Sequence, residues 1–156
     1  MTSLLFVLGL LNAVGVPGQD RPIPVARPAY DEALAKRLGA DERGMKSYVL
    51  VILKAGPKAE VSEEERKKLF TGHMANIGRL TAEGKLVAAG PMAPNDRQYE
   101  GIFIFNVKTI KDAEALLATD PAVAAGALAF ETYGWYGSAA LQDIVDIHGR
   151  IDKTGR

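Results

Sequence analysis

Two residues in the middle of the chain have side chains that could share one proton. His73 lies in a stretch of helical periodicity, and Asp120 stands directly before Pro121, 47 residues later. A carboxylate that hydrogen-bonds to one imidazole nitrogen fixes the tautomer of the ring and leaves the other nitrogen as a base near neutral pH. His73 and Asp120 are therefore a candidate acid–base pair, provided that the fold brings them together.

Each of the two residues also has a purely structural interpretation. A lone histidine among apolar helical positions is commonly a satisfied core residue. An aspartate before a proline is a common N-cap, because proline is favourable in the first turn of a helix. Neither residue alone indicates a site, and a shared role depends on their meeting in space.

The elements around His73 and Asp120 follow the order βαββαβ between residues 47 and 135. Ser62 and Glu65 have the spacing of a capping box and Gly84 suits a C′ position, so they bound the first long helix. Strands are predicted at 47–54, 86–89, 101–107 and 128–136, with the second broken at Gly90-Pro91, and helices at 30–38, 62–83, 109–118 and 139–151. A helical turn opened by Asp120-Pro121 is expected to end near Gly126. This order predicts a ferredoxin-like α+β domain.

Four residues of the first long helix share one face, which we call the His73 stripe: Leu69, His73, Ile77 and Leu80. In a βαββαβ fold the start of this helix, the hairpin between the second and third strands, and the entry to the fourth strand share one end of the sheet. Gly90 and Pro91 are therefore candidates for contact with a substrate near His73 and Asp120.

The last predicted strand carries three aromatic residues, Tyr133, Trp135 and Tyr136. Trp135 is a further candidate for substrate binding, because an aromatic side chain could line a pocket for a ring compound. Packing in the core of a dimer is the competing interpretation of all three residues.

Strands 47–54 and 101–107 carry apolar side chains on both faces. Two helices can cover only one face of a four-stranded sheet, and an exposed apolar face of that size would be unusual in a monomer. The simplest cover is a second copy packed sheet to sheet, which predicts a homodimeric α+β barrel. The C-terminal helix at 139–151 is the competing cover.

The composition excludes several classes of protein. The chain has 156 residues, 47% hydrophobic and 24% charged, which fits one globular domain. Lys+Arg and Asp+Glu both total 19, so no charge field attracts nucleic acid or an anionic membrane. The absence of cysteine excludes disulfides, thiolate nucleophiles and iron–sulfur clusters.

No cofactor or metal is expected from the motifs. The sequence has no phosphate-binding glycine loop, dinucleotide fingerprint or HExxH zinc motif. Four residues near the C-terminus offer closely spaced donor atoms, but a solvated helical face explains them better than a metal site: Asp143, Asp146, His148 and Asp152. Ser138 lacks the strand-to-helix elbow of a nucleophilic serine.

The N-terminus contains an apolar run at residues 4–16, which has the length of a signal-peptide core and is too short to span a membrane. Ala13-Val14-Gly15 supplies a small-x-small cleavage pattern. No lysine or arginine precedes the run, so a buried extension or a mis-assigned start codon is the alternative. We expect a signal peptide at 1–18, a linker with a short helix at 19–44, the domain at 45–137 and a helical tail at 138–156, in a periplasmic or secreted protein.

The sequence from His73 to Leu80, with Gly84-Lys85-Leu86 and Ala89-Gly90-Pro91, resembles the YCII-related (YciI-like) family. Asp120-Pro121 with Gly126 matches its second characteristic segment, and the likeness covers roughly residues 46–135. The resemblance implies a dimeric α+β barrel in which His73 and Asp120 act together, here in an exported branch with an N-terminal extension. Where many relatives have a large aromatic residue after the Asp-Pro, this chain has Ala122-Val123.

The resemblance also implies a range of chemistry. One branch is linked to dehydrochlorination of a chlorinated hydroxyquinol, and similar barrels include muconolactone isomerases and cofactor-free oxygenases. Our first hypothesis is therefore a cofactor-independent lyase or isomerase in which His73 is the base and Asp120 orients it. The second is a non-catalytic periplasmic protein that binds a small ligand or serves as an accessory. A heme-handling barrel is a third hypothesis and would need an axial ligand open to the pocket.

Overall fold

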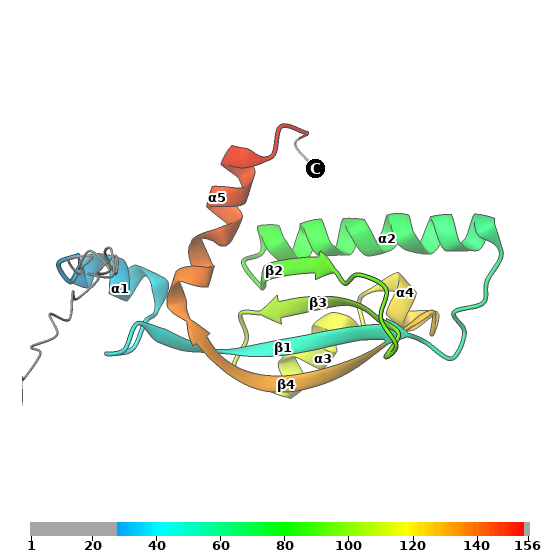
Figure 1. The fold of residues 1–156 in the computed structure, drawn as a ribbon, viewed down its shortest axis with the longest axis horizontal. Helices are drawn as coiled ribbons and strands as arrows, with labels where there is room; N and C mark the ends of the chain where they lie inside the picture. The colour runs from blue at the N-terminus through cyan, green and yellow to red at the C-terminus, as the bar shows by residue number, and fades with distance from the viewer. Residues whose placement is uncertain (1–27, 155–156) are drawn as a thin grey trace, which may run out of the picture. The chain divides into compact units, whose positions relative to one another are not determined.

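The computed structural model describes residues 28–154, and these contain one antiparallel sheet with the strand order β2-β3-β1-β4 (Figure 1). The strands are β1 (Met45–Ala55), β2 (Leu86–Pro91), β3 (Tyr99–Phe105) and β4 (Leu128–Ser138). Helix α2 (Glu63–Ala82) joins β1 to β2, and α3 (Ile110–Leu117) with the short α4 (Pro121–Ala124) joins β3 to β4. The fold is the predicted ferredoxin-like α+β arrangement.

Several sequence predictions concern residues that precede this part of the chain. The predicted signal peptide and most of the predicted linker lie outside the described residues. Within residues 28–154, no helix has the length and apolar character needed to cross a membrane.

Helix α2 begins and ends where the sequence predicts. Ser62 caps it, its hydroxyl accepting a hydrogen bond from the backbone N–H of Glu65 at 3.2 Å. After the helix, Gly84 takes a left-handed conformation with φ 66°, which glycine adopts without a steric penalty. The His73 stripe faces inward, with Leu69 and Leu80 buried and Ile77 packed against the core.

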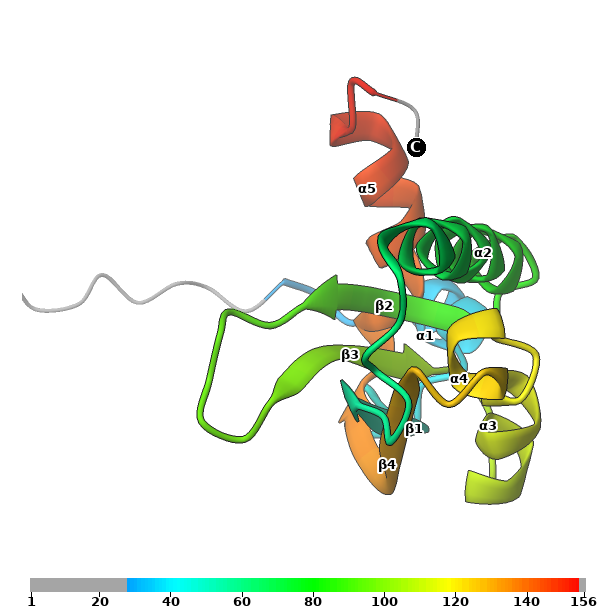
Figure 2. The ribbon, with the colours of Figure 1, turned by 90° about the vertical axis from the view of Figure 1, so that its right-hand side faces the viewer.

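The hydrophobic core lies between the sheet and the helices α2 and α3, which pack on the same face of the sheet (Figure 2). Leu80 of α2 is fully buried, as are Ala113 and Leu117 of α3. The strands contribute alternate residues, as expected for side chains that point to opposite faces of a strand: Val49, Val51, Leu53, Leu86, Phe103 and Phe105.

The other face of the sheet carries a second set of apolar residues, which we call the open face: Leu50, Ile52, Ile102, Ile104, Tyr133 and Trp135. Antiparallel pairing sets Leu50 beside Ile104 and Tyr133, and it sets Ile52 beside Ile102. Trp135 contacts Tyr48, with ring centroids 5.8 Å apart. In one chain, Tyr133 is 48% exposed and Trp135 is 36% exposed. No described helix covers these two residues.

One predicted strand end is wrong, and one predicted helix is divided. Strand β2 continues through Gly90 and Pro91, which pair with Ile102 and Gly101, although the prediction broke it there. Proline is tolerated because β2 is an edge strand, where a missing N–H removes no hydrogen bond to a neighbouring strand. The predicted helix at 139–151 is divided into a 3₁₀ helix, η1 (Ala139–Asp143), and α5 (Ile144–Ile151).

Helix α1 (Glu32–Leu38) ends at Gly39, as predicted, and lies near η1. The Arg37 guanidinium donates two hydrogen bonds to the Asp143 carboxylate, at 2.8 and 2.9 Å. The Asp143 carboxylate makes no capping hydrogen bond to α5. Helix α5 packs beside the edge strand β2, so it does not cover the open face around β1 and β4 (Figure 1).

Candidate active site

His73 and Asp120 are in direct contact. Nδ1 of His73 lies 2.7 Å from Oδ2 of Asp120, and the Asp120 side chain is fully buried while that of His73 is 14% exposed. The imidazole also stacks on Phe103 of β3, with ring centroids 5.8 Å apart and planes 19° apart. A hydrogen bond on one edge and an aromatic ring against one face together hold the histidine in a single orientation.

The two oxygens of Asp120 have different partners. Oδ1 accepts a hydrogen bond from the backbone N–H of Ala122 at 2.9 Å, so Asp120 is the N-cap of α4. Oδ2 accepts from His73 and, at 3.3 Å, from the side-chain amide of Asn76. The expected N-cap role is therefore confirmed, and it coexists with the contact to His73.

These contacts determine the ionisation of Asp120. Burial raises the pKa of the Asp120 carboxyl, but the hydrogen bond and charge of His73, together with the amides of Ala122 and Asn76, lower that pKa to below its ordinary value. Asp120 is thus an anion that only accepts hydrogen bonds, so Nδ1 of His73 carries the proton. In the neutral ring, Nε2 is then the unprotonated nitrogen. It has no hydrogen-bond partner among residues 28–154.

Asn76 connects this pair to the surface. Its side-chain oxygen accepts a hydrogen bond from Arg79 at 2.8 Å and lies 3.0 Å from the hydroxyl of Thr119, so its amide nitrogen must point to Asp120. Asn76 is 7% exposed and lies one turn after His73 on α2. The sequence analysis did not single it out, because a buried asparagine on a helix shows no motif without its partners.

Helices α2 and α4 approach closely beside the pair. A Cβ added to Gly72 would lie 2.9 Å from Cγ and 3.3 Å from Cβ of Pro121, closer than normal packing allows. Gly72 precedes His73, and Pro121 follows Asp120. The absence of a side chain at Gly72 therefore lets α4 come near enough for Asp120 to reach His73.

A cavity of about 330 Å³ adjoins His73. Most of its lining is apolar and comes from α2, α4, the ends of β1 and β4, and the loops that adjoin them: Ala55, Ala59, Val61, Leu69, Phe70, Ala122, Ala127 and Leu128. Arg66, His73 and Glu100 are its charged or titratable residues. A hollow of this size with apolar walls and few polar groups is typical of a site for a small molecule.

Three predicted substrate-binding residues do not line this cavity. Gly90 and Pro91 lie in β2, and Trp135 lies on the open face beside Tyr48. Their contact with a substrate remains a prediction, and the geometry of one chain gives it no support. Arg66, Phe70 and Glu100 line the cavity but were not among the predicted site residues. The helical period does place Arg66 and Phe70 close to the His73 stripe.

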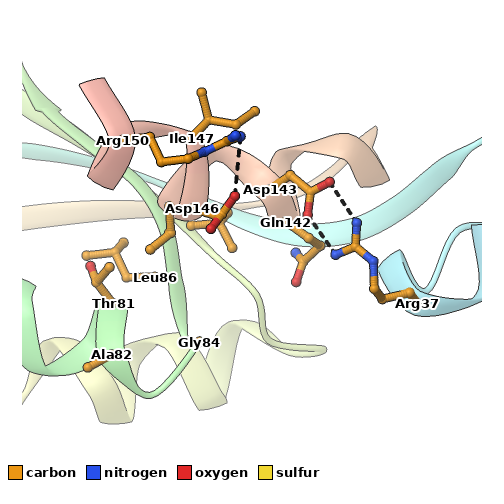
Figure 3. A pocket seen from close by; sticks show the side chains of 12 residues that line it. Arg37, Thr81, Ala82, Gly84, Leu86, Gln142, Asp143, Asp146, Ile147 and Arg150 are labelled. Carbon is orange, nitrogen blue, oxygen red and sulfur yellow. Dashed lines mark hydrogen bonds and ion pairs between the residues drawn. The ribbon is translucent and has the colours of Figure 1, made fainter. Parts of the chain in front are cut away.

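A second cavity, of about 640 Å³, lies between α5, the end of α2 and the start of β2 (Figure 3). Its charged side chains are already paired, Arg37 with Asp143 and Arg150 with Asp146. Within residues 28–154, no group of three or more histidine, aspartate or glutamate side chains is arranged to hold a metal ion. The cavity beside His73 is therefore the stronger candidate for an active site.

Comparison with known families places this geometry in context. The model of the YCII-related domain matches residues 47–133, which include both His73 and Asp120. The chain belongs to the YCII-related domain family. The resemblance seen in the sequence is thereby confirmed at the level of the family, and the matched segment begins in β1 and ends in β4.

A solved structure is similar to this YCII-related protein in part. It is 5-chloro-2-hydroxyhydroquinone dehydrochlorinase from Burkholderia phenoliruptrix AC1100, in complex with 2,5-dihydroxybenzoquinone. The two are 20% identical with a TM-score of 0.44, over 56% of this chain and 92% of that one. No curated protein matches the chain in sequence.

Proposed function

We propose that this YCII-related protein is a cofactor-independent enzyme that abstracts a proton from a small cyclic or carbonyl compound. His73 is the general base, acting through Nε2, and Asp120 orients the imidazole. The observation that carries the proposal is the 2.7 Å contact between His73 Nδ1 and a fully buried carboxylate, made beside a small apolar cavity.

The expected reaction is an elimination or an isomerisation. In either case, the proton passes from a substrate carbon to Nε2 of His73. In an elimination, the electron pair of the broken C–H bond forms the new double bond while a leaving group departs with its own electron pair. In an isomerisation, the pair is delocalised toward a carbonyl and the proton returns from His73 to another carbon.

Hydrogen–deuterium exchange tests the proposal before the natural substrate is identified. A panel of cyclic ketones, lactones and hydroxylated rings is incubated with the protein in D₂O, and loss of carbon-bound protons is followed by NMR. We expect the wild type to accelerate exchange in at least one compound. His73→Gln should lower that acceleration by about 10²–10⁴-fold, the usual contribution of a general base.

His148→Gln is the matched control, because His148 is the other histidine of the chain and lies on α5 away from the cavity. Its exchange rates should equal those of the wild type. Equal rates in wild type and His73→Gln would refute a catalytic role for His73. Binding of compounds without any exchange would favour the non-catalytic ligand-binding function instead.

A homodimer is part of the proposal. The open face presents adjacent apolar rows on β3, β1 and β4, and in one chain its residues are only half-buried or exposed. Packing the same face of a second copy against it would remove this surface from water and form the barrel expected for the family. The Lys54–Glu131 ion pair, at 2.6 Å, borders the apolar rows and would help to set the register.

Export from the cytoplasm is the last part of the proposal, and it is supported only by the apolar run at residues 4–16. Cleavage near residue 18 would leave the folded domain intact, because its compact unit begins at Asp31. Expression of the full chain with cell fractionation and N-terminal sequencing tests this. A cytoplasmic protein that retains residue 1 would refute export.

A further inference from the structure

The cavity beside His73 contains one cationic side chain whose charge is not already matched. Arg66 lines the cavity from α2, seven residues before His73, and is also exposed to solvent. Seven residues are about two helical turns, so the two side chains project from nearly the same side of α2, roughly 10 Å apart along its axis. Among residues 28–154, the Arg66 side chain has no hydrogen bond and no ion pair.

Two carboxylates lie in or beside the cavity, those of Asp120 and Glu100. Asp120 is fully buried and already accepts hydrogen bonds from His73, Asn76 and the N–H of Ala122, so it is not accessible to a ligand. Glu100, from β3, is the one carboxylate in the cavity lining, and it forms no hydrogen bond or ion pair with Arg66. The cavity thus offers a free cation and a hydrogen-bond acceptor between apolar walls.

Proton abstraction by His73 adds negative charge to the bound molecule. A charge in an apolar cavity is costly unless an opposite charge or strong donors meet it. Among the residues that line the cavity, Arg66 is the cation able to do so. Its planar guanidinium can donate two hydrogen bonds to one carboxylate, or to an enolate oxygen and an adjacent oxygen of the same ligand.

We propose that Arg66 binds an ionised oxygen of the ligand, so that the ligands of this site are small monoanionic hydroxy acids or enols. The volume of about 330 Å³ suits a single-ring compound. Glu100 selects against a second anionic group and accepts a hydrogen bond from a ligand hydroxyl. The reaction at His73 rests on the function proposed above, whereas the recognition of the anion by Arg66 is independent of it.

The test uses two probes that differ in charge and little in shape, 4-hydroxybenzoate and 4-hydroxybenzamide. Binding to the full chain is followed by two-dimensional ¹H–¹⁵N NMR, using the backbone amides of Ala122, Ala127 and Leu128 in the cavity wall. We expect the wild type to bind the acid roughly tenfold more tightly than the amide, the scale of one charge-assisted hydrogen bond. Arg66→Gln should abolish this preference, and Arg66→Lys should restore part of it.

Lys67→Gln is the matched control, since it removes the same charge from the next residue of α2, which does not line the cavity. It should bind both probes as the wild type does. Equal affinity of the wild type for acid and amide would overturn the proposal. So would unchanged acid binding in Arg66→Gln, or the absence of saturable shifts with the acid.

His73→Gln separates this inference from the proposed function. If both are right, this variant keeps its preference for the acid and loses hydrogen–deuterium exchange. If His73→Gln exchanges like the wild type while Arg66→Gln loses the acid preference, the proposed function fails and the anion site stands. If Arg66→Gln keeps the acid preference while His73→Gln loses exchange, the anion site fails and the proposed function stands.

Discussion

His73 of α2 and Asp120 at the start of α4 are joined by a 2.7 Å contact between Nδ1 and Oδ2, although 47 residues separate them in the chain. The second oxygen of Asp120 caps α4 through the N–H of Ala122. One carboxylate therefore determines both where α4 begins and how the imidazole is held. Any change at Asp120 should alter the local fold and the tautomer of His73 together.

Asp120→Asn is expected to disturb the tautomer of His73. Asparagine keeps the side-chain volume and a capping oxygen, but it removes the charge that holds the proton on Nδ1. The variant should show a mixture of ring tautomers and lose about 1–3 kcal/mol of unfolding free energy, the cost of weakened buried hydrogen bonds. ¹⁵N NMR of the ring nitrogens measures this, with His148 as the internal control. The same single tautomer in both proteins would show that Asp120 does not determine it.

The stability that Asp120 contributes should depend on pH. Because the pKa of Asp120 is lowered in the folded state, the unfolded chain binds this proton first as the pH falls. The stabilisation is therefore complete above the unfolded pKa of about 4 and is lost as the pH falls through the lower folded pKa. The difference in unfolding free energy between wild type and Asp120→Asn, from urea titrations, should shrink as the pH falls from about 4 toward pH 2. A difference that does not change with pH would contradict the lowered pKa.

Gly72→Ala and Gly78→Ala should have opposite effects on stability, although both replace a glycine of α2. Alanine favours a helix by about 1 kcal/mol over glycine. At Gly78 a Cβ meets nothing within 4 Å, so Gly78→Ala should be stabilising. At Gly72 the Cβ would meet the Pro121 ring, and overpacking of this kind typically costs about 1–3 kcal/mol.

Chemical denaturation of the two glycine variants compares their stabilities. The ring nitrogens of His73 report whether α4 has moved away in Gly72→Ala. Equal stabilisation by both substitutions would show that α2 and α4 can separate without loss, and that close packing at Gly72 is not needed for the His73–Asp120 contact.

Leu50→Lys should convert a dimer into a monomer. Leu50 lies in the middle of the open face, between Ile104 and Tyr133, where a charge would be desolvated by a second copy but solvated in a single chain. Sedimentation equilibrium should give twice the mass of one chain for the wild type and the mass of one chain for the variant. Ile151→Lys is the control, because Ile151 is 72% exposed on α5. A wild type with the mass of a single chain would refute the homodimer.

Local chemistry determined the elements of the fold. Ser62 and Gly84 bound α2, and Asp120 caps α4, as the sequence predicts. These signals are readable because the capping residue and its partner lie within a few residues of each other. Apolar residues on both faces of β1 likewise indicated that the sheet has a helix-covered face and a second apolar face.

Tertiary structure decided which further residues share the site with His73 and Asp120. The place of Pro91 inside β2 is explained only by the position of β2 at the edge of the sheet. Glu100 reaches the cavity because β3 pairs with β1, and the last residue of β1 forms part of the cavity wall. Trp135 is of a residue type that often lines ligand pockets. Side-chain alternation along β4 nevertheless directs it to the open face. The types and local spacing of residues predict helices, strands and caps, because those depend on near neighbours. The cavity, its free arginine and the partners of Asn76 depend on contacts between distant segments, which only the packing of helices on the sheet creates.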